Sequence, residues 1–232
     1  MATLNFLAGR DGAPKMDFHE WVNDFDFYLA TDWVITETGS GTRAIAQAKD
    51  GILVVTNAAA DNDVNSLQAR QVASGQVAED WKFVAGKKLL FETRFKVSDA
   101  TQSDLVIGLH ITATTPVASA PSDGIYFRKD DGDRLIDLYG VKNSTGSTAT
   151  GVLGQSGYLT DDTYTTLAFY YDGKTAAQGG TISAWQDGVN FGSIPLTNVV
   201  DDEELAISFA HQNGEAVAKI LSLDYIRVIQ ER

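Results

Sequence analysis

The chain of 232 residues contains no cysteine, and its basic residues are few. The first absence excludes disulfides, thiolate catalysis and cysteine-ligated zinc. Lys and Arg number 18 against 31 Asp and Glu, for a net charge of −13, so nucleic acid is not an expected partner because phosphates attract clustered Lys and Arg. No stretch approaches the roughly 18 apolar residues of a membrane span, so no membrane partner is expected.

The N-terminus also lacks the pattern of a secretory signal peptide, because Met1–Arg10 has no basic region followed by an apolar run. Together with the missing cysteine, this predicts a protein made in a reducing cytoplasm. One domain is expected, since a single β-sandwich can occupy this length.

Convincing helices are scarce, and short apolar segments separated by Asp-Gly and Asn-Gly turns predominate. The predicted strands cover residues 33–36, 51–56, 89–97, 105–111, 125–128, 135–139, 164–171, 181–186, 189–194, 205–210 and 219–230. Their spacing of roughly 8–15 residues predicts an all-β jelly-roll or sandwich of two antiparallel sheets. Between Met16 and Trp33 the apolar spacing fits a helix and a strand equally, so periodicity leaves that segment open.

The last predicted strand, Lys219 to Gln230, organises the rest of the chain. Strict alternation of the side chains makes both faces of this strand apolar. One face carries Leu221, Leu223, Tyr225 and Ile229, and the other carries Ile220, Ile226 and Val228. A strand that is apolar on both faces belongs inside a covered sheet, and its partners must be much earlier segments. The fold is therefore expected to close by long-range pairing.

The segment Asp224–Gln230, with the sequence Asp-Tyr-Ile-Arg-Val-Ile-Gln, resembles the closing strand of the concanavalin A-like lectin and glucanase superfamily. The hairpin signal Trp185-Gln186-Asp187-Gly188 is similar to one common in that superfamily. The resemblance implies a concanavalin A-like jelly roll over residues 21–232, preceded by an N-terminal arm, residues 1–20. More narrowly, residues 31–36, 51–63 and 226–232 resemble head-decoration proteins of tailed bacteriophages.

Glycoside hydrolysis is the first enzymatic activity to test, because it needs two carboxylates about 5–10 Å apart. In the laminarinase-like branch of the superfamily they come from one strand as Glu-x-Asp-x-x-Glu, and this run is missing. Glu203 and Glu204 are adjacent and would point to opposite faces of a strand. His19, His110 and His211 lie far apart in the sequence and are expected to be structural. These observations predict that the chain is not an enzyme.

Calcium is the one cofactor that the sequence brings into question. Asp61, Asp63 and Asn65 copy the opening of a calcium loop, but a serine and a valine stand where the loop needs its glycine and its glutamate. Three carboxylates, Asp130, Asp131 and Asp133, cluster on one turn, where ordinary turn chemistry accounts for them. Superfamily members often bind calcium in loops, so the resemblance favours this turn as the calcium candidate.

The resulting hypothesis is a non-enzymatic virion protein, a decoration or cement subunit on the capsid surface, made in the host cytoplasm. Its expected partners are the major capsid protein and two further copies in a homotrimer. The apolar N-terminal segment is expected to contact the capsid or a sister subunit, because it has more aromatic content than a lone tail can usefully expose. The predicted contact residues are Leu4, Phe6, Met16, Phe18 and Trp21.

The alternative is a carbohydrate-binding, lectin-like module, on a virion or secreted, with a glycan as its partner. It requires an exposed aromatic ring on the concave sheet. Four tryptophans could supply one, Trp21, Trp33, Trp81 and Trp185. Tryptophans serve cores and interfaces more often than they serve as sugar platforms.

Overall fold

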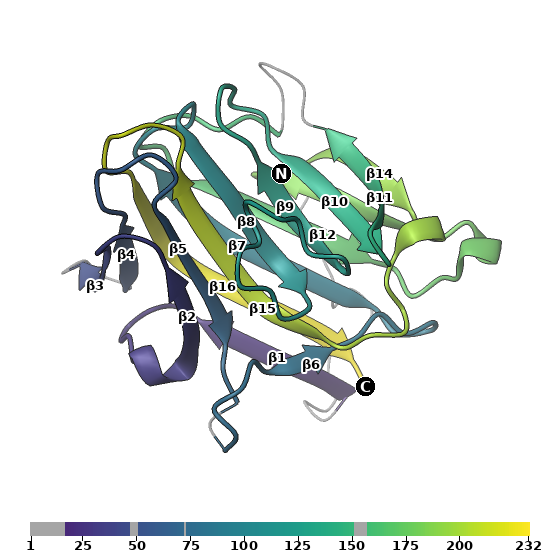
Figure 1. Ribbon diagram of the computed structural model, residues 1–232. Helices are drawn as coiled ribbons and strands as arrows, with labels where there is room; N and C mark the ends of the chain where they lie inside the picture. Colours follow the sequence, from purple (N-terminus) through teal and green to yellow (C-terminus); the bar gives the residue numbers. More distant parts are fainter. Residues whose placement is uncertain (1–16, 47–50, 72, 151–156) are drawn as a thin grey trace.

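The structure is a computed structural model that describes residues 17–46, 51–71, 73–150 and 157–232. In this part of the chain, two antiparallel sheets pack face to face, and only short 3₁₀ turns interrupt the strands (Figure 1). The predicted jelly-roll sandwich is confirmed. Within the described residues, no helix has both the length and the apolar character needed to cross a membrane.

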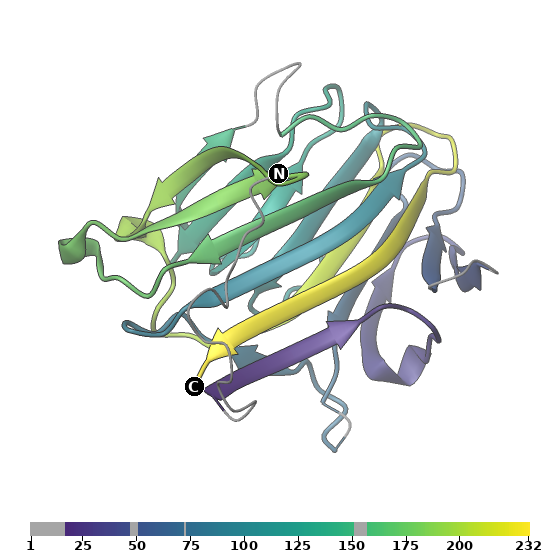
Figure 2. The same cartoon turned by 180° about the vertical axis from the view of Figure 1, so that it is seen from behind.

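The first sheet is built around the C-terminal strand. Its strands in spatial order are β14 (Val189–Pro195), β13 (Thr181–Gln186), β12 (Thr165–Tyr171), β7 (Leu89–Val97), β16 (Ile220–Glu231), β4 (Ile52–Thr56) and β3 (Thr42–Ala46). The remaining strand, β1 (Phe18–Asn23), pairs with the second half of β16, whose first half pairs with β4 (Figure 2). The prediction that the last strand lies inside a sheet is confirmed.

The second sheet carries the other half of the sandwich. Its order is β11 (Thr145–Thr150), β10 (Asp137–Lys142), β9 (Gly124–Lys129), β8 (Ser103–His110), β15 (Leu205–Asn213), β5 (Val64–Ala69) and β2 (Trp33–Glu37), with β6 (Glu79–Trp81) paired to the start of β15. Three short 3₁₀ turns, η2 (Ala30–Asp32), η3 (Ala176–Gln178) and η4 (Leu196–Asn198), lie in the connections.

The strand β16 departs from the alternation expected for it. Its register shifts between Leu223 and Tyr225, so two residues of β16 oppose one of β7 at Asp224. Leu223 before this bulge and Ile226 after it both face the core, whereas Tyr225 and Ile229 face outward. The predicted grouping of residues 220–229 into two faces was therefore wrong beyond Leu223, because a bulge exchanges the faces of every residue that follows.

The N-terminal boundary also falls inside a strand. β1 begins at Phe18, so the predicted division at residue 20 lies within it, and residues 1–16 lie outside the described residues. The segment that fitted both periods, described from residue 17 onward, forms this strand followed by a turn that ends in η2. Phe25 sits in that turn with a φ of 52° and a fully buried side chain.

The connection between β8 and β9, residues 111–123, lies against the outer face of the second sheet (Figure 1). Val117 is buried there against Val106 on β8 and Tyr126 on β9. Its start is held by Gln68, whose amide donates to the Ile111 carbonyl and whose Oε1 accepts from the Ala113 N–H. This part of the sheet is consequently covered by the protein's own chain.

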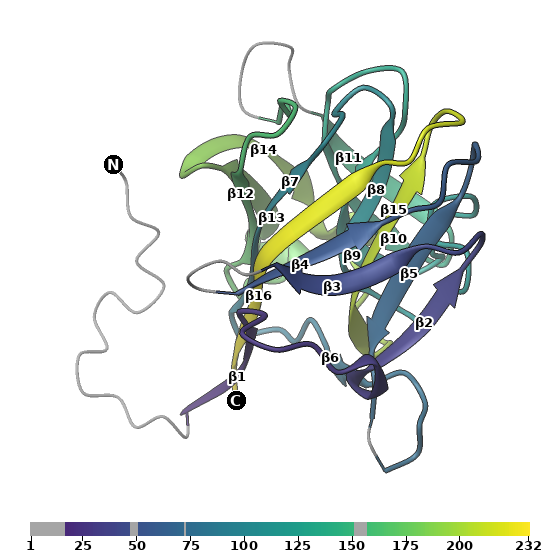
Figure 3. The same cartoon turned by 90° about the vertical axis from the view of Figure 1, so that its left-hand side faces the viewer.

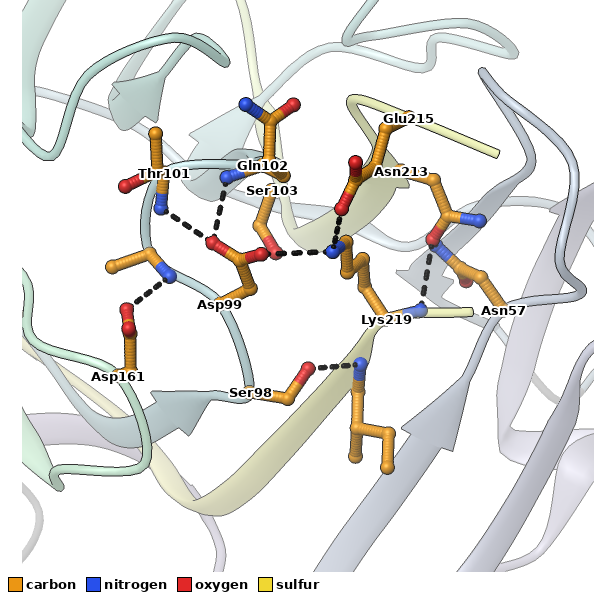
Figure 4. Close-up of polar contacts among 12 residues, drawn as sticks. Asn57, Ser98, Asp99, Thr101, Gln102, Ser103, Asp161, Asn213, Glu215 and Lys219 are labelled. Carbon is orange, nitrogen blue, oxygen red and sulfur yellow. Dashed lines mark hydrogen bonds and ion pairs between the residues drawn. The ribbon is translucent and has the colours of Figure 1, made fainter. Parts of the chain in front are cut away.

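A buried polar cluster lies where β16 begins (Figure 4). The Lys219 ammonium, almost fully buried, donates to the carboxylates of Asp99 (2.8 Å) and Glu215 (2.5 Å). Asp99 also accepts the backbone N–H groups of Thr101 and Gln102. Burial opposes the charge on Lys219, but the hydrogen bonds and charges of Asp99 and Glu215 raise its pKa above the ordinary value. The ion pair therefore ties β16 to the loop after β7.

Candidate functional site

A groove with a cavity volume of about 350 Å³ opens at the end of the sandwich where β1 and β6 meet. Figure 3 shows this end, with β1 from the first sheet and β6 and β2 from the second close to one another. Four aromatic residues line the groove, Trp21, Phe27, Trp33 and Trp81. A concave site with aromatic walls and few polar groups is the usual form of a small-molecule site.

The aromatic rings divide into a buried floor and an accessible wall. Trp33 and Trp81 are 4% and 3% exposed, and Trp33 also meets Phe209 of the core at 5.3 Å. Trp21 is half-buried and meets the ring of Trp33 edge-on at 6.2 Å. Phe27, which follows the tight turn at Phe25, is 67% exposed at the rim. Trp21 and Phe27 therefore present the apolar surface that a ligand would contact.

The strand β1 alternates across this groove. His19, Trp21 and Asn23 line it, as does the exposed Val22, and His19 stacks on Trp81 with ring centroids 4.3 Å apart. Phe18 faces the other way and packs beside Leu90 on the outer surface of the first sheet. The alternation follows from strand geometry, which sends successive side chains to opposite faces.

Three carboxylates line the same groove, from Asp24, Asp32 and Asp80. Among the described residues, none of the three carboxylates has a hydrogen-bond or ion-pair partner. Ionised carboxylates accept hydrogen bonds and donate none, so these groups can accept hydrogen bonds from the hydroxyl groups of a ligand. Arg70 completes the wall, and its guanidinium is fixed by bonds to the carbonyls of Gly75 (3.2 Å) and Thr31 (3.1 Å).

The structure separates the residues predicted as a contact group. Leu4, Phe6 and Met16 lie outside the described residues, whereas Phe18 and Trp21 lie on opposite faces of β1. Of the four tryptophans considered as sugar platforms, three line the groove, and Trp185 lies on the outer face of the first sheet beside Tyr170. The groove residues His19, Phe27 and Asp80 carried no sequence signal, because they come together only when β1 meets β6.

An aromatic residue also occupies the outer face of the second sheet. Tyr126 stacks on Tyr139 with ring centroids 5.9 Å apart, but it is fully buried beneath the connection 111–123. The ring that the lectin-like alternative would need on an open sheet face is therefore covered at this position.

The predicted calcium turn holds a lysine ammonium. Nζ of Lys129, which is buried, donates to the carbonyls of Ser103 (2.6 Å) and Asp130 (2.8 Å). Burial lowers the pKa of Lys129, and nearby carboxylates, Asp104 first, oppose that shift. Asp104 itself lies close by and accepts the backbone N–H of Asp131 at 2.6 Å.

Two of the three carboxylates of the turn have other partners. Asp130 pairs with Arg128 at 2.8 Å, and Asp133 accepts the backbone N–H of Leu135. Nowhere in the described part of the chain do three or more His, Asp or Glu side chains gather as metal ligands. Calcium at Asp130, Asp131 and Asp133 stays a prediction.

Comparison with solved structures identifies the fold. The Bacillus licheniformis β-glucanase is similar over 90% of this chain and 97% of its own, with a TM-score of 0.61 and 13% identity. The endo-β-1,4-glucuronan lyase from Trichoderma reesei matches over 90% and 94%, with a TM-score of 0.57 and 10% identity. The potassium-bound carbohydrate recognition domain of Emp46p matches over 89% and 94%, with a TM-score of 0.59 and 11% identity.

These similarities confirm the concanavalin A-like fold. No protein-family model matches the sequence, and no curated protein matches it. Emp46p has been solved both with potassium and free of metal, so a cation is compatible with this fold. None of the proteins named here supports the predicted virion role, and the capsid partner, the trimer and the virion location stay predictions.

The prediction that the chain is not an enzyme is corrected by the same comparison. The similar structures include two polysaccharide-cleaving enzymes, a β-glucanase and a glucuronan lyase. The missing Glu-x-Asp-x-x-Glu run excludes only the branch that uses it, because carboxylates from different strands can meet after folding. Enzymatic activity is therefore an open question for this chain.

Proposed function

We propose that the chain binds carbohydrate in the groove between β1 and β6. The observation that carries the proposal is the combination of accessible aromatic rings, Trp21 and Phe27, with the unpartnered carboxylates Asp24, Asp32 and Asp80 on one concave surface. A sugar ring has apolar C–H faces, which pack on aromatic rings, and a rim of hydroxyl groups, which donate to carboxylates.

The size of the groove and the fold are consistent with this class of ligand. A volume of about 350 Å³ lies at the lower end of the range typical of small-molecule sites and suits one or two sugar rings. The structural neighbours include a carbohydrate recognition domain, a β-glucanase and a glucuronan lyase. At such low sequence identity they support the ligand class only by analogy of fold.

The test is calorimetric titration of the whole chain with a panel of β-linked oligosaccharides. Phe27→Ala and Trp21→Ala are expected to weaken binding about tenfold or more, because each removes a ring from the accessible wall. Trp185→Ala is the matched control, since Trp185 lies outside the groove on the first sheet. Thermal unfolding of each variant checks that the fold is retained.

The proposal fails if no oligosaccharide binds, or if Trp185→Ala weakens binding as much as the groove variants do. Each titrated sample is also analysed for shortened or unsaturated products, because three carboxylates line the groove. Product formation that is lost in Asp80→Asn would assign an activity to the same site.

A further inference from the structure

A second cavity of about 330 Å³ adjoins the groove. The two cavities share the lining residues His19 and Asp80, so they lie side by side, and together they are called the trough below. At its far side the trough is lined by three cationic side chains, from Lys82, Lys87 and Arg232. The aromatic part of the trough thus lies beside a cationic part.

Cations without a carboxylate partner are unusual in this acidic chain. Among the described residues, most Lys and Arg side chains form an ion pair with an Asp or Glu. These paired basic residues are Arg43, Lys82, Arg94, Lys96, Arg128, Arg134, Lys142, Lys174, Lys219 and Arg227. Lys129 is buried among backbone carbonyls. The others are Arg70 in the groove, Lys87 and Arg232 in the second cavity, and Lys88, the chain neighbour of Lys87.

Of the three carboxylates that line the second cavity, Glu204 and Glu231 have partners, and Asp80 has none in the described part of the chain. Glu204 pairs with Lys82 at 3.4 Å, and Glu231 accepts the backbone N–H of Lys88 at 3.1 Å. Lys87, by contrast, is only half-exposed and has no carboxylate partner in the described part of the chain. In a chain with 31 acidic against 18 basic residues, an unpaired cation in the wall of a cavity indicates a ligand that supplies a negative charge.

We propose that the ligand of the trough is an acidic oligosaccharide. Its anionic group, a uronic acid carboxylate or a sulfate ester, lies between Lys87 and Arg232, while a neighbouring sugar ring packs on Trp21 and Phe27. Charge-assisted hydrogen bonds from Lys and Arg to an oxyanion are stronger than bonds between neutral groups, and they fix the direction of the chain in the trough. This inference rests on the proposed carbohydrate-binding function.

The test compares ligands that differ only in charge. The wild-type chain is titrated with β-1,4-linked oligoglucuronate, with a neutral β-1,4-gluco-oligosaccharide of the same length and with its sulfated form. The variant Lys87→Gln removes the unpaired cation, and Lys174→Gln is the control, because it makes the same charge change at an exposed lysine outside the trough.

The expected result is that an acidic ligand binds more tightly than the neutral one. Lys87→Gln should lower affinity for the acidic ligand about tenfold and leave the neutral ligand unchanged, whereas Lys174→Gln should change neither. The preferred acidic ligand identifies the anionic group as carboxylate or sulfate.

Three outcomes overturn the inference, and they differ in what they say of the proposed function. If neutral and acidic ligands bind equally and both depend on Phe27, carbohydrate binding stands and the acidic ligand does not. If Lys87→Gln and Lys174→Gln weaken the acidic ligand alike, the effect is one of overall charge and the assignment of Lys87 fails. If no ligand binds, both proposals fail together.

Discussion

Two buried histidines should make the folded chain sensitive to mild acid. His110 and His211 are both 0% exposed. Burial lowers the pKa of His110 to about 4, and burial together with the charges of Lys129 and Lys219 lowers the pKa of His211 to about 3. Nε2 of His110 and Nδ1 of His211 have no hydrogen-bond partner within the described residues, so a second proton on either ring would be a buried, uncompensated charge.

The magnitude follows from the difference between the folded and unfolded states. In the unfolded chain each histidine titrates near its ordinary pKa of about 6.5, so below that pH the unfolded state binds up to two more protons than the folded state. Each such proton lowers the free energy of unfolding by about 1.4 kcal/mol per pH unit. Between pH 7.5 and pH 5 the two histidines together should remove roughly 4 kcal/mol.

The stabilisation is therefore complete above about pH 6.5 and is lost progressively as the pH falls toward the folded-state pKa values of about 4 and about 3. Against a total stability of about 5–15 kcal/mol for a typical domain, the loss is large enough to measure directly. Unfolding in urea, followed by tryptophan fluorescence at half-unit steps from pH 7.5 to pH 5, gives the free energy at each pH.

The variants His110→Phe and His211→Gln identify the source of the slope. Each removes one of the two buried titrations, so each should reduce the pH dependence to about half of the wild-type value, whatever its stability at pH 7.5. The third histidine, His19, is unchanged in all three proteins. A free energy that stays flat from pH 7.5 to pH 5 in the wild type, or a slope unchanged in both variants, would refute the reasoning.

Three further changes probe the packing. Lys219→Met removes the ammonium that pairs with Asp99 and Glu215, and it should lower the free energy of unfolding in urea by about 2 kcal/mol. This is less than the loss for a fully buried pair, because both carboxylates are partly exposed. The control Lys174→Met, at an exposed ion pair, should lower it far less. Gly124→Ala would bring a methyl group to 2.6 Å from the backbone carbonyl oxygen of Leu109 and should lower the free energy of unfolding by about 2 kcal/mol or more. In the control Gly146→Ala the added methyl group has no neighbour closer than 3.4 Å, so the loss should be under about 1 kcal/mol in the same assay. Val117→Asp should detach the connection 111–123 and open it to limited proteolysis, and Ala118→Asp, at an exposed position beside it, should not.

The fold was predictable from the sequence because its signals are local. Turn residues such as Asp187-Gly188 separate the strands, and the apolar run from Lys219 to Gln230 indicates a strand covered on both sides. The bulge at Asp224 was not predictable in the same way. Both faces of β16 are apolar, so the alternation reads equally well in either frame, and only the pairing with β7 decides between them.

The groove could not be predicted because its parts are distant in sequence. Trp21, Trp33 and Trp81 belong to different strands, and the sequence shows three tryptophans without showing that they meet. Phe27 reaches the rim because the chain turns sharply at Phe25, which has an unusual positive φ for a bulky residue. The prediction that the chain is not an enzyme was wrong for a related reason. It depended on the missing Glu-x-Asp-x-x-Glu run, but carboxylates from different strands can meet after folding, and the sequence does not show which ones do.

The central position of β16 sets the order in which this protein can be completed during synthesis. β7, β4 and β1 all leave the ribosome earlier, yet each must wait for β16 before its backbone groups are paired on that side. Until then these strands offer open edges to other nascent chains. The speed at which β16 is translated, and chaperones that shield unpaired edges, should consequently influence the yield of this chain more than substitutions in its early hairpins.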